Sequence, residues 1–245
     1  MKQTEVIMGM PITIEIVDTD AANHFATIFN YFRAVDDRYS TYKETSEISQ
    51  INRGLPTKKW SDEMSQVLAL CEETKQETHG YFDIMYHGKR DPSGLVKGWS
   101  IRNAASQLRE AGVDNFYIEA GGDIEVNGRN MQGMIWSVGI RNPFDMNEIV
   151  KSLRIAAGGV ATSGTYIRGQ HIYDPHHPDE LIDEVKSLTV IGPDVYDADR
   201  FATAAFAMGL RGIEFIAATP GLEGYMIDKD KTATYTNGFE RYIDT

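Results

Sequence analysis

The sequence predicts an α+β fold in which mostly antiparallel sheets pack with helices. Apolar segments of strand length cluster between residues 116 and 156 and recur after residue 185, so strands do not alternate strictly with helices. Several longer segments place apolar residues at spacings of three and four, which is the period of an amphipathic helix. The 22 glycines and 8 prolines are scattered, and no repeat or linker is visible, so we expect one domain over residues 1–245.

The first third of the chain is expected to form one strand and two helices. Isoleucine at every second position predicts a strand within residues 5–17. A helical pattern then begins at Asp20. Its apolar face consists of Phe25, Ile28, Phe29, Phe32 and Val35. Ser61 is a suitable N-cap for a second helix that Gly80 can end. The buried side of that second helix is expected to comprise Met64, Val67, Leu68 and Cys71.

The rest of the chain is expected to hold two more helices and a series of short strands. A third helix is expected over residues 98–111, where Gly112 stops it, and a fourth over residues 196–208. The middle strands are expected at Phe116–Ile118, Ile124–Val126, Ile135–Ile140, Leu153–Ala156 and Leu188–Ile191. The C-terminal strands are expected at residues 225–227, 233–235 and 239–243, the last one after a hairpin turn at Asn237-Gly238.

The composition argues against several functional classes. Acidic residues outnumber basic ones by 36 to 24, and the resulting net charge of −12 disfavours binding to nucleic acid or to an anionic membrane. Cys71 is the single cysteine, so no disulfide can form within the chain. No apolar stretch reaches the length of a membrane span, and residues 1–5 show no apolar signal segment, so we expect a cytoplasmic location.

Three glycine-rich or polar stretches interrupt the core-like sequence. Residues 90–99 read as a turn running into a helix, where Asp91 and Lys97 could contact a ligand beside free helix N–H groups; a plain capped turn is the alternative. Residues 120–124 contain paired glycines and are more typical of a turn between strands. Residues 158–168 are small and rich in hydroxyl groups, so they either cradle a phosphate or connect two buried strands.

Two further stretches carry groups suited to catalysis. Three histidines lie within seven residues, but their spacing is not a zinc pattern and no cysteine is near. His171 is therefore the better catalytic candidate, and His176 and His177 are expected at a loop surface. Asp199 and Thr203 are four residues apart and share a helix face, which offers two hard oxygen ligands for Mg²⁺. A capping Asp and a Thr bonded to its own helix are the structural alternative.

The order of the motifs along the chain is more specific than any one of them. The motifs are Met8-Gly9, Tyr39-Ser40-Thr41-Tyr42, Ser46-Glu47-Ile48, Ile51-Asn52, Gly80-Tyr81-Phe82-Asp83-Ile84, Asp91…Lys97-Gly98, Gly121-Gly122-Asp123, Trp136-Ser137-Val138-Gly139-Ile140, Ala161-Thr162-Ser163-Gly164, His171…Asp174-Pro175 and Ala198-Asp199…Ala202-Thr203-Ala204. Together they resemble the FAD:protein FMN transferases, the ApbE family, over almost the whole chain.

The resemblance implies a T-fold-related architecture and an Mg²⁺-dependent transferase with FAD as its substrate. Such an enzyme cleaves FAD, attaches FMN through a phosphoester to a Thr or Ser hydroxyl of an acceptor protein, and releases AMP. The resemblance further implies that Gly94, Asp199 and Thr203 hold the metal, and that His171 and Asp199 are catalytic, His171 by assisting proton transfer. The positions implied to contact FAD are Met8, Tyr42, Phe82, Asp83, Ile84, Asp91, Lys97 and Tyr173.

The chain departs from the family pattern at two places. Many members are exported lipoproteins with a leader, whereas this sequence starts directly at its first strand, and the segment between Asp83 and Asp91 is very short. Two other functions stay open. One is an Mg²⁺-dependent FAD pyrophosphatase that yields FMN and AMP, which only an acceptor protein distinguishes from a transferase. The other is a flavin-binding protein without turnover, which a tightly bound, redox-active flavin without metal would favour.

Overall fold

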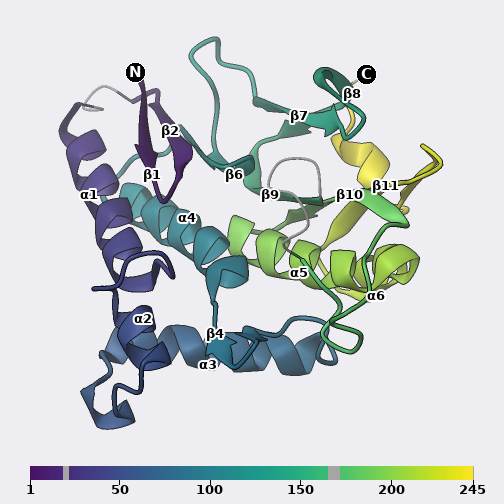
Figure 1. The fold of residues 1–245 in the computed structure, drawn as a ribbon. Coiled ribbons are helices and arrows are strands. Elements are labelled where there is room, and N and C mark those ends of the chain that lie inside the picture. Colours follow the sequence, from purple (N-terminus) through teal and green to yellow (C-terminus); the bar gives the residue numbers. More distant parts are fainter. Residues whose placement is uncertain (19–21, 165–171, 245) are drawn as a thin grey trace.

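The chain is built around one large antiparallel sheet, seen in a computed structural model that describes residues 1–18, 22–164 and 172–244 (Figure 1). The sheet has eight strands in the order β1-β2-β5-β6-β9-β10-β11-β12, and every neighbouring pair is antiparallel. Its strands are β1 Lys2–Ile7, β2 Met10–Ile16, β5 Phe116–Ala120, β6 Asp123–Asn127, β9 Ala157–Gly164, β10 Val185–Gly192, β11 Glu223–Asp228 and β12 Ala233–Tyr235. The predicted α+β class with mostly antiparallel pairing is confirmed.

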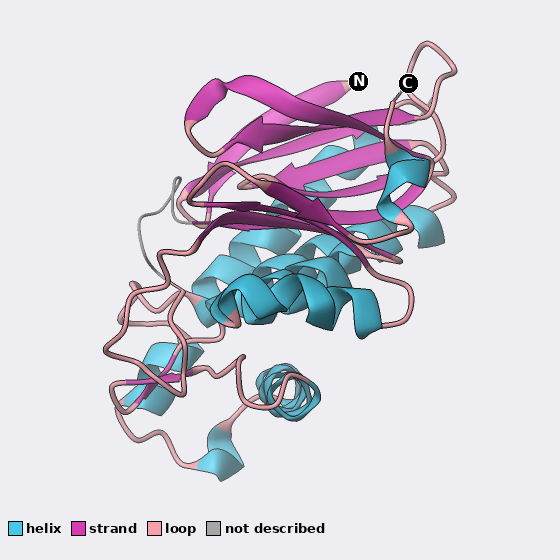
Figure 2. Ribbon diagram, turned by 90° about the vertical axis from the view of Figure 1, so that its right-hand side faces the viewer, coloured by secondary structure: helices cyan, strands magenta, loops and turns pink. Residues whose placement is uncertain are grey.

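Helices cover one face of this sheet, and Figure 2 shows them gathered below the strands. They are α1 Ala22–Tyr39, α4 Ser93–Glu110, α5 Val195–Ala207 and α6 Gly212–Ala218, with the short 3-10 helix η2 Gly209–Arg211 before α6. Helices α1 and α4 bury their apolar residues against β1, β2 and β5, while α5 and α6 bury theirs against β9, β10 and β11. The predicted apolar face of α1 is confirmed, because all five of its residues are buried.

A hairpin covers the opposite face of the sheet. It consists of β7 Trp136–Asn142 and β8 Asp145–Ile155, and the 3-10 helix η3 Phe239–Tyr242 packs beside it. Trp136, Leu153 and Phe239 form one apolar cluster with residues of β6, β9, β10 and β11. The middle strands of the large sheet are therefore buried on both faces, which explains their apolar or small side chains.

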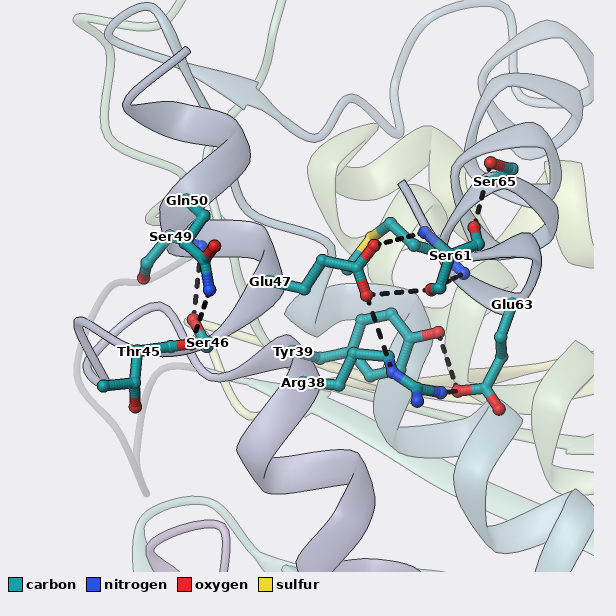
Figure 3. Close-up of polar contacts among 11 residues, drawn as sticks. Arg38, Tyr39, Thr45, Ser46, Glu47, Ser49, Gln50, Ser61, Glu63 and Ser65 are labelled. Carbon is teal, nitrogen blue, oxygen red and sulfur yellow. Dashed lines mark hydrogen bonds and ion pairs between the residues drawn. The ribbon is translucent and has the colours of Figure 1, made fainter. Parts of the chain in front are cut away.

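A further helical layer lies beyond α1 and α4. It contains α2 Glu47–Asn52, the 3-10 helix η1 Thr57–Lys59 and α3 Asp62–Glu77, and it is followed by the small hairpin of β3 Met85–Tyr86 and β4 Lys89–Arg90. Figure 3 shows the polar contacts that join α1, α2 and α3. The Glu47 carboxylate accepts hydrogen bonds from Ser61 N at 2.6 Å and Ser61 Oγ at 2.8 Å. Arg38 of α1 pairs with both Glu47 and Glu63. These contacts fix where α2 and α3 begin relative to α1.

The predicted cap of α3 is confirmed. Ser61 Oγ accepts the N–H of Met64 at 3.1 Å, so it satisfies one of the free donors at the helix start. Ser46 caps α2 in the same way by accepting the N–H of Ser49 at 3.1 Å. None of the described helices is long and apolar enough to cross a membrane.

The N-terminal prediction of a single strand is wrong, because residues 2–16 form the hairpin β1–β2. Its turn is Met8-Gly9, where both residues have positive φ, 57° and 72°. Two-residue hairpin turns require this left-handed backbone, which Gly9 adopts freely. Met8 is an uncommon residue in such a turn, so the Ile and Val pattern runs across it without a visible break.

The interpretation of residues 158–168 as a loop is wrong over its described part, because residues 157–164 form the central strand β9. The strand pairs with β6 on one side and β10 on the other. Its glycines serve packing: a Cβ on Gly159 would lie 2.0 Å from Val195 N, at the start of α5. The backbone amides of β9 are therefore largely engaged in the sheet rather than arranged as a phosphate cradle.

Two further element boundaries differ from the predictions. Helix α4 begins at Ser93 rather than at residue 98, because Asp91 Oδ1 accepts the Ser93 N–H at 3.0 Å and starts the helix early. Residues 239–242 form η3 rather than a third C-terminal strand. Glu223 Oε2 accepts the Gly238 N–H at 3.1 Å, and Phe239 is fully buried, so the chain turns inward after β12.

Candidate active site

A cavity of about 410 Å³ lies where α4 and α5 meet the segments 81–94 and 172–181. It is lined by nine of the site residues that the family resemblance implies. These are Phe82, Asp83, Ile84, Asp91, Gly94, Lys97, Tyr173, Asp199 and Thr203. They come from separate parts of the chain, and the fold brings them to one place. Gly121, Thr162, Ser163 and Gly164 also line the cavity.

The deepest charged group in the cavity wall is the Asp199 carboxylate on α5. The residue is only 3% exposed, and its Oδ2 accepts the Gly98 N–H of α4 at 2.9 Å. This approach of α4 to α5 requires glycine at position 98, because a Cβ there would lie 2.7 Å from Asp199 Cβ and 2.7 Å from Val195 O. Gly98 therefore allows the close helix contact that orients Asp199.

Lys97 lies between two buried carboxylates. Its Nζ is 2.6 Å from Asp123 Oδ2 and 3.4 Å from Asp199 Oδ1. Burial raises the pKa of Asp199 to about 7; Lys97 acts in the opposite direction, and the neighbouring Asp123 adds to the increase. With both carboxylates ionised, the three groups sum to −1. The floor of the cavity is thus short of one positive charge, which suits a bound cation.

Thr203 and Gly94 complete the set of oxygens implied to hold a metal. Thr203 follows Asp199 by one helical turn on the same face of α5. A Cβ on Gly94 would lie 3.5 Å from Thr203 Cγ2, so the Gly94 backbone runs directly beside that side chain. Carboxylate, hydroxyl and backbone carbonyl are hard oxygen donors of the kind that Mg²⁺ prefers. The donor set and the uncompensated negative charge both fit Mg²⁺.

The outer wall of the cavity is formed by the 82–84 segment and by Tyr173. The Tyr173 hydroxyl donates to the carbonyl oxygens of Met85 at 3.1 Å and Asp83 at 3.3 Å. Burial raises the pKa of Tyr173 to about 12, so this hydroxyl stays protonated and remains a donor. Lys75 of α3 pairs with Asp83 at 2.7 Å. These contacts hold the wall from two sides.

Met8, Tyr42 and His171 are not placed in the cavity by the described residues. Met8 lies in the β1–β2 turn and packs, partly buried, between two apolar clusters. Tyr42 is 96% exposed and lines an adjoining groove of about 440 Å³, which shares Tyr86 and Asp91 with the cavity. His171 falls outside the described residues.

His176 and His177 lie at the surface of a loop, where the sequence predicts them. His176 and His177 are exposed, which confirms their predicted surface location. His176 Nε2 lies 3.1 Å from the His79 carbonyl oxygen, and His177 Nδ1 lies 3.0 Å from Asp174 Oδ2. Within the described residues, no group of three or more His, Cys, Asp or Glu side chains is arranged to hold a metal ion.

One group at the site escaped the sequence reasoning, namely Asp123. The Gly121-Gly122-Asp123 stretch is a tight turn between the antiparallel strands β5 and β6, as predicted, with φ of 60° and 98° at the two glycines. Asp123 itself is 1% exposed and reaches Lys97. The available signal was a carboxylate directly after the paired glycines, at the first position of a strand.

Comparison with known proteins gives consistent matches. The family model described as the ApbE family matches residues 8–88 and 89–226. The FAD:protein FMN transferase of Vibrio cholerae is 31% identical over 164 residues, which are 63% of this chain and 48% of that protein. The enzyme of the same name from Escherichia coli K12 is 28% identical over 149 residues, which are 57% of this chain and 42% of that protein. The matched part spans about half the length, or less, of these curated relatives.

Solved structures share the fold over the whole chain. The flavin transferase ApbE from Vibrio cholerae matches with a TM-score of 0.87 and 22% identity, covering 99% of this chain and 98% of that one. The ApbE protein from Thermotoga maritima also has a TM-score of 0.87, with 18% identity, covering 100% of this chain and 99% of that one. At such low identity these two likenesses show the fold.

Proposed function

Because the chain belongs to the ApbE family, as a family model matching most of its length shows, we propose that it is an Mg²⁺-dependent FAD:protein FMN transferase built on a single domain, residues 1–245. It attaches FMN through a phosphoester to a Thr or Ser hydroxyl of an acceptor protein and releases AMP. The observation that carries the proposal is the cavity, whose lining combines the buried Asp199 carboxylate with eight other predicted site residues.

FAD is the proposed occupant of the cavity and of the groove beside it. Phe82, Ile84 and Tyr173 supply apolar and aromatic surface for a flavin, and Asp83 and Asp91 supply acceptors for hydroxyl or amide donors. The two hollows are continuous in their lining through Tyr86 and Asp91. A dinucleotide that extends from the cavity into the groove reaches Tyr42, the aromatic residue implied by the family resemblance. Met8, in the β1–β2 turn, packs against the apolar cluster that includes Phe82.

Asp199, Thr203 and the Gly94 carbonyl are the proposed ligands of Mg²⁺. When bound, the ion neutralises charge on the pyrophosphate oxygens and on the departing AMP. Asp199 is the ligand that contributes a full negative charge, and its orientation is fixed by the Gly98 N–H. Lys97, whose ammonium faces the same cavity, adds a fixed positive charge for the phosphates.

The remaining requirement is the removal of one proton. The acceptor hydroxyl forms a bond to the phosphorus of the FMN half, the bond from that phosphorus to the bridging oxygen breaks, and AMP leaves. The hydroxyl proton has to be taken up, and His171 is the proposed base because imidazole titrates near neutral pH. Its role rests on the family resemblance and on its place two residues before Tyr173 in the sequence.

The decisive experiment is incubation with FAD, Mg²⁺ and a candidate acceptor domain, followed by intact-mass measurement of the acceptor. The proposal expects a gain equal to one FMN less one water. A matched acceptor with its Thr or Ser changed to Ala should gain nothing. Release of FMN and AMP with no mass gain on any acceptor would indicate the pyrophosphatase instead. A bound flavin without turnover in the presence of Mg²⁺ would indicate the flavin-binding protein.

A further inference from the structure

Lys97 and Asp199 line the cavity, Asp123 is buried beside them, and the three charged groups are unequally spaced. Lys97 Nζ is 2.6 Å from Asp123 Oδ2 but 3.4 Å from Asp199 Oδ1. The shorter distance is that of a close ion pair, and at 3.4 Å the attraction between ammonium and carboxylate is weaker. Between these two carboxylates, Asp123 is therefore the stronger partner of the ammonium.

Asp123 is a rigid partner because the sheet holds it. It is the first residue of β6, opposite Ala120 of β5, and its Oδ1 accepts the Thr162 N–H of β9 at 3.2 Å. Its side chain is 2% exposed, so water cannot readily replace either contact. One oxygen is thus tied to the sheet and the other to Lys97. A carboxylate held by two strands sets the position of an ammonium that comes from α4.

Asp199 uses its two oxygens differently. Oδ2 accepts the Gly98 N–H at 2.9 Å, while Oδ1 makes the longer contact to Lys97. If the ammonium moved toward Asp199, its positive charge would compensate the negative charge of this carboxylate. The ammonium would then compete with a divalent cation for the same oxygen, because two cations cannot share it without repulsion.

We propose that Asp123 is a positioning residue for the metal site, which holds the Lys97 ammonium away from Asp199 Oδ1 and leaves that oxygen available to Mg²⁺. This inference rests on the proposed function, in which Asp199 is a metal ligand. It predicts that Asp123 acts through Lys97. A direct metal ligand, or a carboxylate that attracts the ion through space, would act whether or not Lys97 is present.

The test is a double-mutant cycle on Mg²⁺ affinity, measured by calorimetry with FAD-free protein. The variants are Asp123→Asn, Lys97→Gln and their combination; Asn keeps an oxygen that can accept the Thr162 N–H. We expect Asp123→Asn to weaken Mg²⁺ binding about tenfold in the parent, and less than about threefold when Lys97 is already Gln. Asp197→Asn is the matched control, because this carboxylate lies on the same helix but pairs with Arg200. It should leave Mg²⁺ affinity unchanged.

The outcomes separate this inference from the proposed function. Equal losses in the two backgrounds, or no loss in either, would overturn the positioning role while leaving Mg²⁺ binding intact. A parent protein that binds no Mg²⁺ would contradict the proposed metal site and the inference with it. If Lys97→Gln does not fold, the Lys97 ammonium signal in ¹⁵N-lysine-labelled protein replaces it. Without metal, that signal should shift in Asp123→Asn; an unchanged signal would overturn the positioning role.

Discussion

The floor and the outer wall of the cavity are built in different ways. The floor consists of Lys97 on α4 and Asp199 on α5, which line the cavity, and it is supported by Gly98 and by Asp123 of the large sheet. Both carboxylates are almost fully buried. The outer wall consists of the 82–84 segment and Tyr173, which are irregular and, apart from Phe82, partly exposed. It is held by the Tyr173 hydroxyl and a few other contacts such as the Lys75–Asp83 pair.

This difference matches the demands of the proposed reaction. Phosphoryl transfer requires charges at fixed positions, which helices and strands provide better than loops. A flavin ring needs a surface of suitable shape, which loops anchored at a few points can supply. We therefore expect floor variants to affect turnover and metal binding, and wall variants to affect mainly FAD affinity.

The largest effect is expected from Asp199→Ala. Loss of the carboxylate removes a proposed metal ligand, so transfer should fall by on the order of a hundredfold or more. The chain should stay folded, because Lys97 keeps Asp123 at 2.6 Å. Transfer rates and thermal unfolding of this variant should be measured beside Asp197→Asn. Near-parental turnover in Asp199→Ala with unchanged Mg²⁺ dependence would contradict the proposed role of Asp199 as a metal ligand.

A smaller but still large effect is expected from Gly98→Ala. The new methyl group would lie 2.7 Å from Asp199 Cβ and from Val195 O, so α4 and α5 have to separate. We expect a loss of about 1–3 kcal/mol in unfolding free energy and weaker Mg²⁺ binding. Gly94→Ala is the matched comparison, since its methyl group would meet Phe82 and Thr203 at 3.3 and 3.5 Å. Equal stability losses in the two variants would contradict the close-approach argument.

A moderate effect confined to affinity is expected from Tyr173→Phe. The change removes the hydroxyl that donates to the Asp83 and Met85 carbonyls but keeps the ring. Loss of such a bond is worth about 1 kcal/mol, which is about fivefold in FAD affinity, while kcat should change little. Tyr235→Phe serves as the control, because its hydroxyl donates to Glu240 and the residue does not line the cavity or the groove. A fall in kcat with FAD affinity intact would show that Tyr173 contributes to turnover, as the floor residues are expected to do.

The smallest effect is expected from Lys75→Gln. This lysine is 40% exposed in its pair with Asp83, and exposed ion pairs contribute less than about 1 kcal/mol. FAD affinity should fall by less than about fivefold, and the difference from the parent should shrink as salt is added. A large loss of FAD affinity that persists in high salt would show that the outer wall at Asp83 is held as rigidly as the floor.

The sequence was most informative where one residue type had one physical explanation. The five apolar positions of α1 repeat with the helical period, and all of them are buried. Ser61 was recognisable as a cap because its hydroxyl and the following apolar pattern point to the same helix start. Four of the nine cavity residues, Asp91, Lys97, Asp199 and Thr203, were candidates from local sequence alone. The other five came from the family resemblance, since only the fold shows that distant segments meet.

The errors arose where packing overrode local signals. Gly158 and Gly159 suggested a loop, but Gly159 allows the start of α5 to lie directly against β9, and Gly158 has a positive φ and lies close to the Gly192 carbonyl oxygen. Met8 adopts a positive φ, and nothing about a methionine in the sequence predicts this backbone conformation. Asp123 looked like a turn residue, and its contact with Lys97 depends on the way the sheet and α4 come together. Such tertiary contacts leave no periodic trace in one sequence.

The most direct test of the proposed transferase activity is the ratio of AMP released to acceptor modified. Parent protein, FAD, Mg²⁺ and an acceptor domain should give AMP and FMN-modified acceptor in a one-to-one ratio, and FMN in place of FAD should give neither. Asp199→Ala should reduce both products together. AMP formed in large excess over modified acceptor, or an acceptor modified equally well from FMN, would contradict the proposed transfer of FMN from FAD.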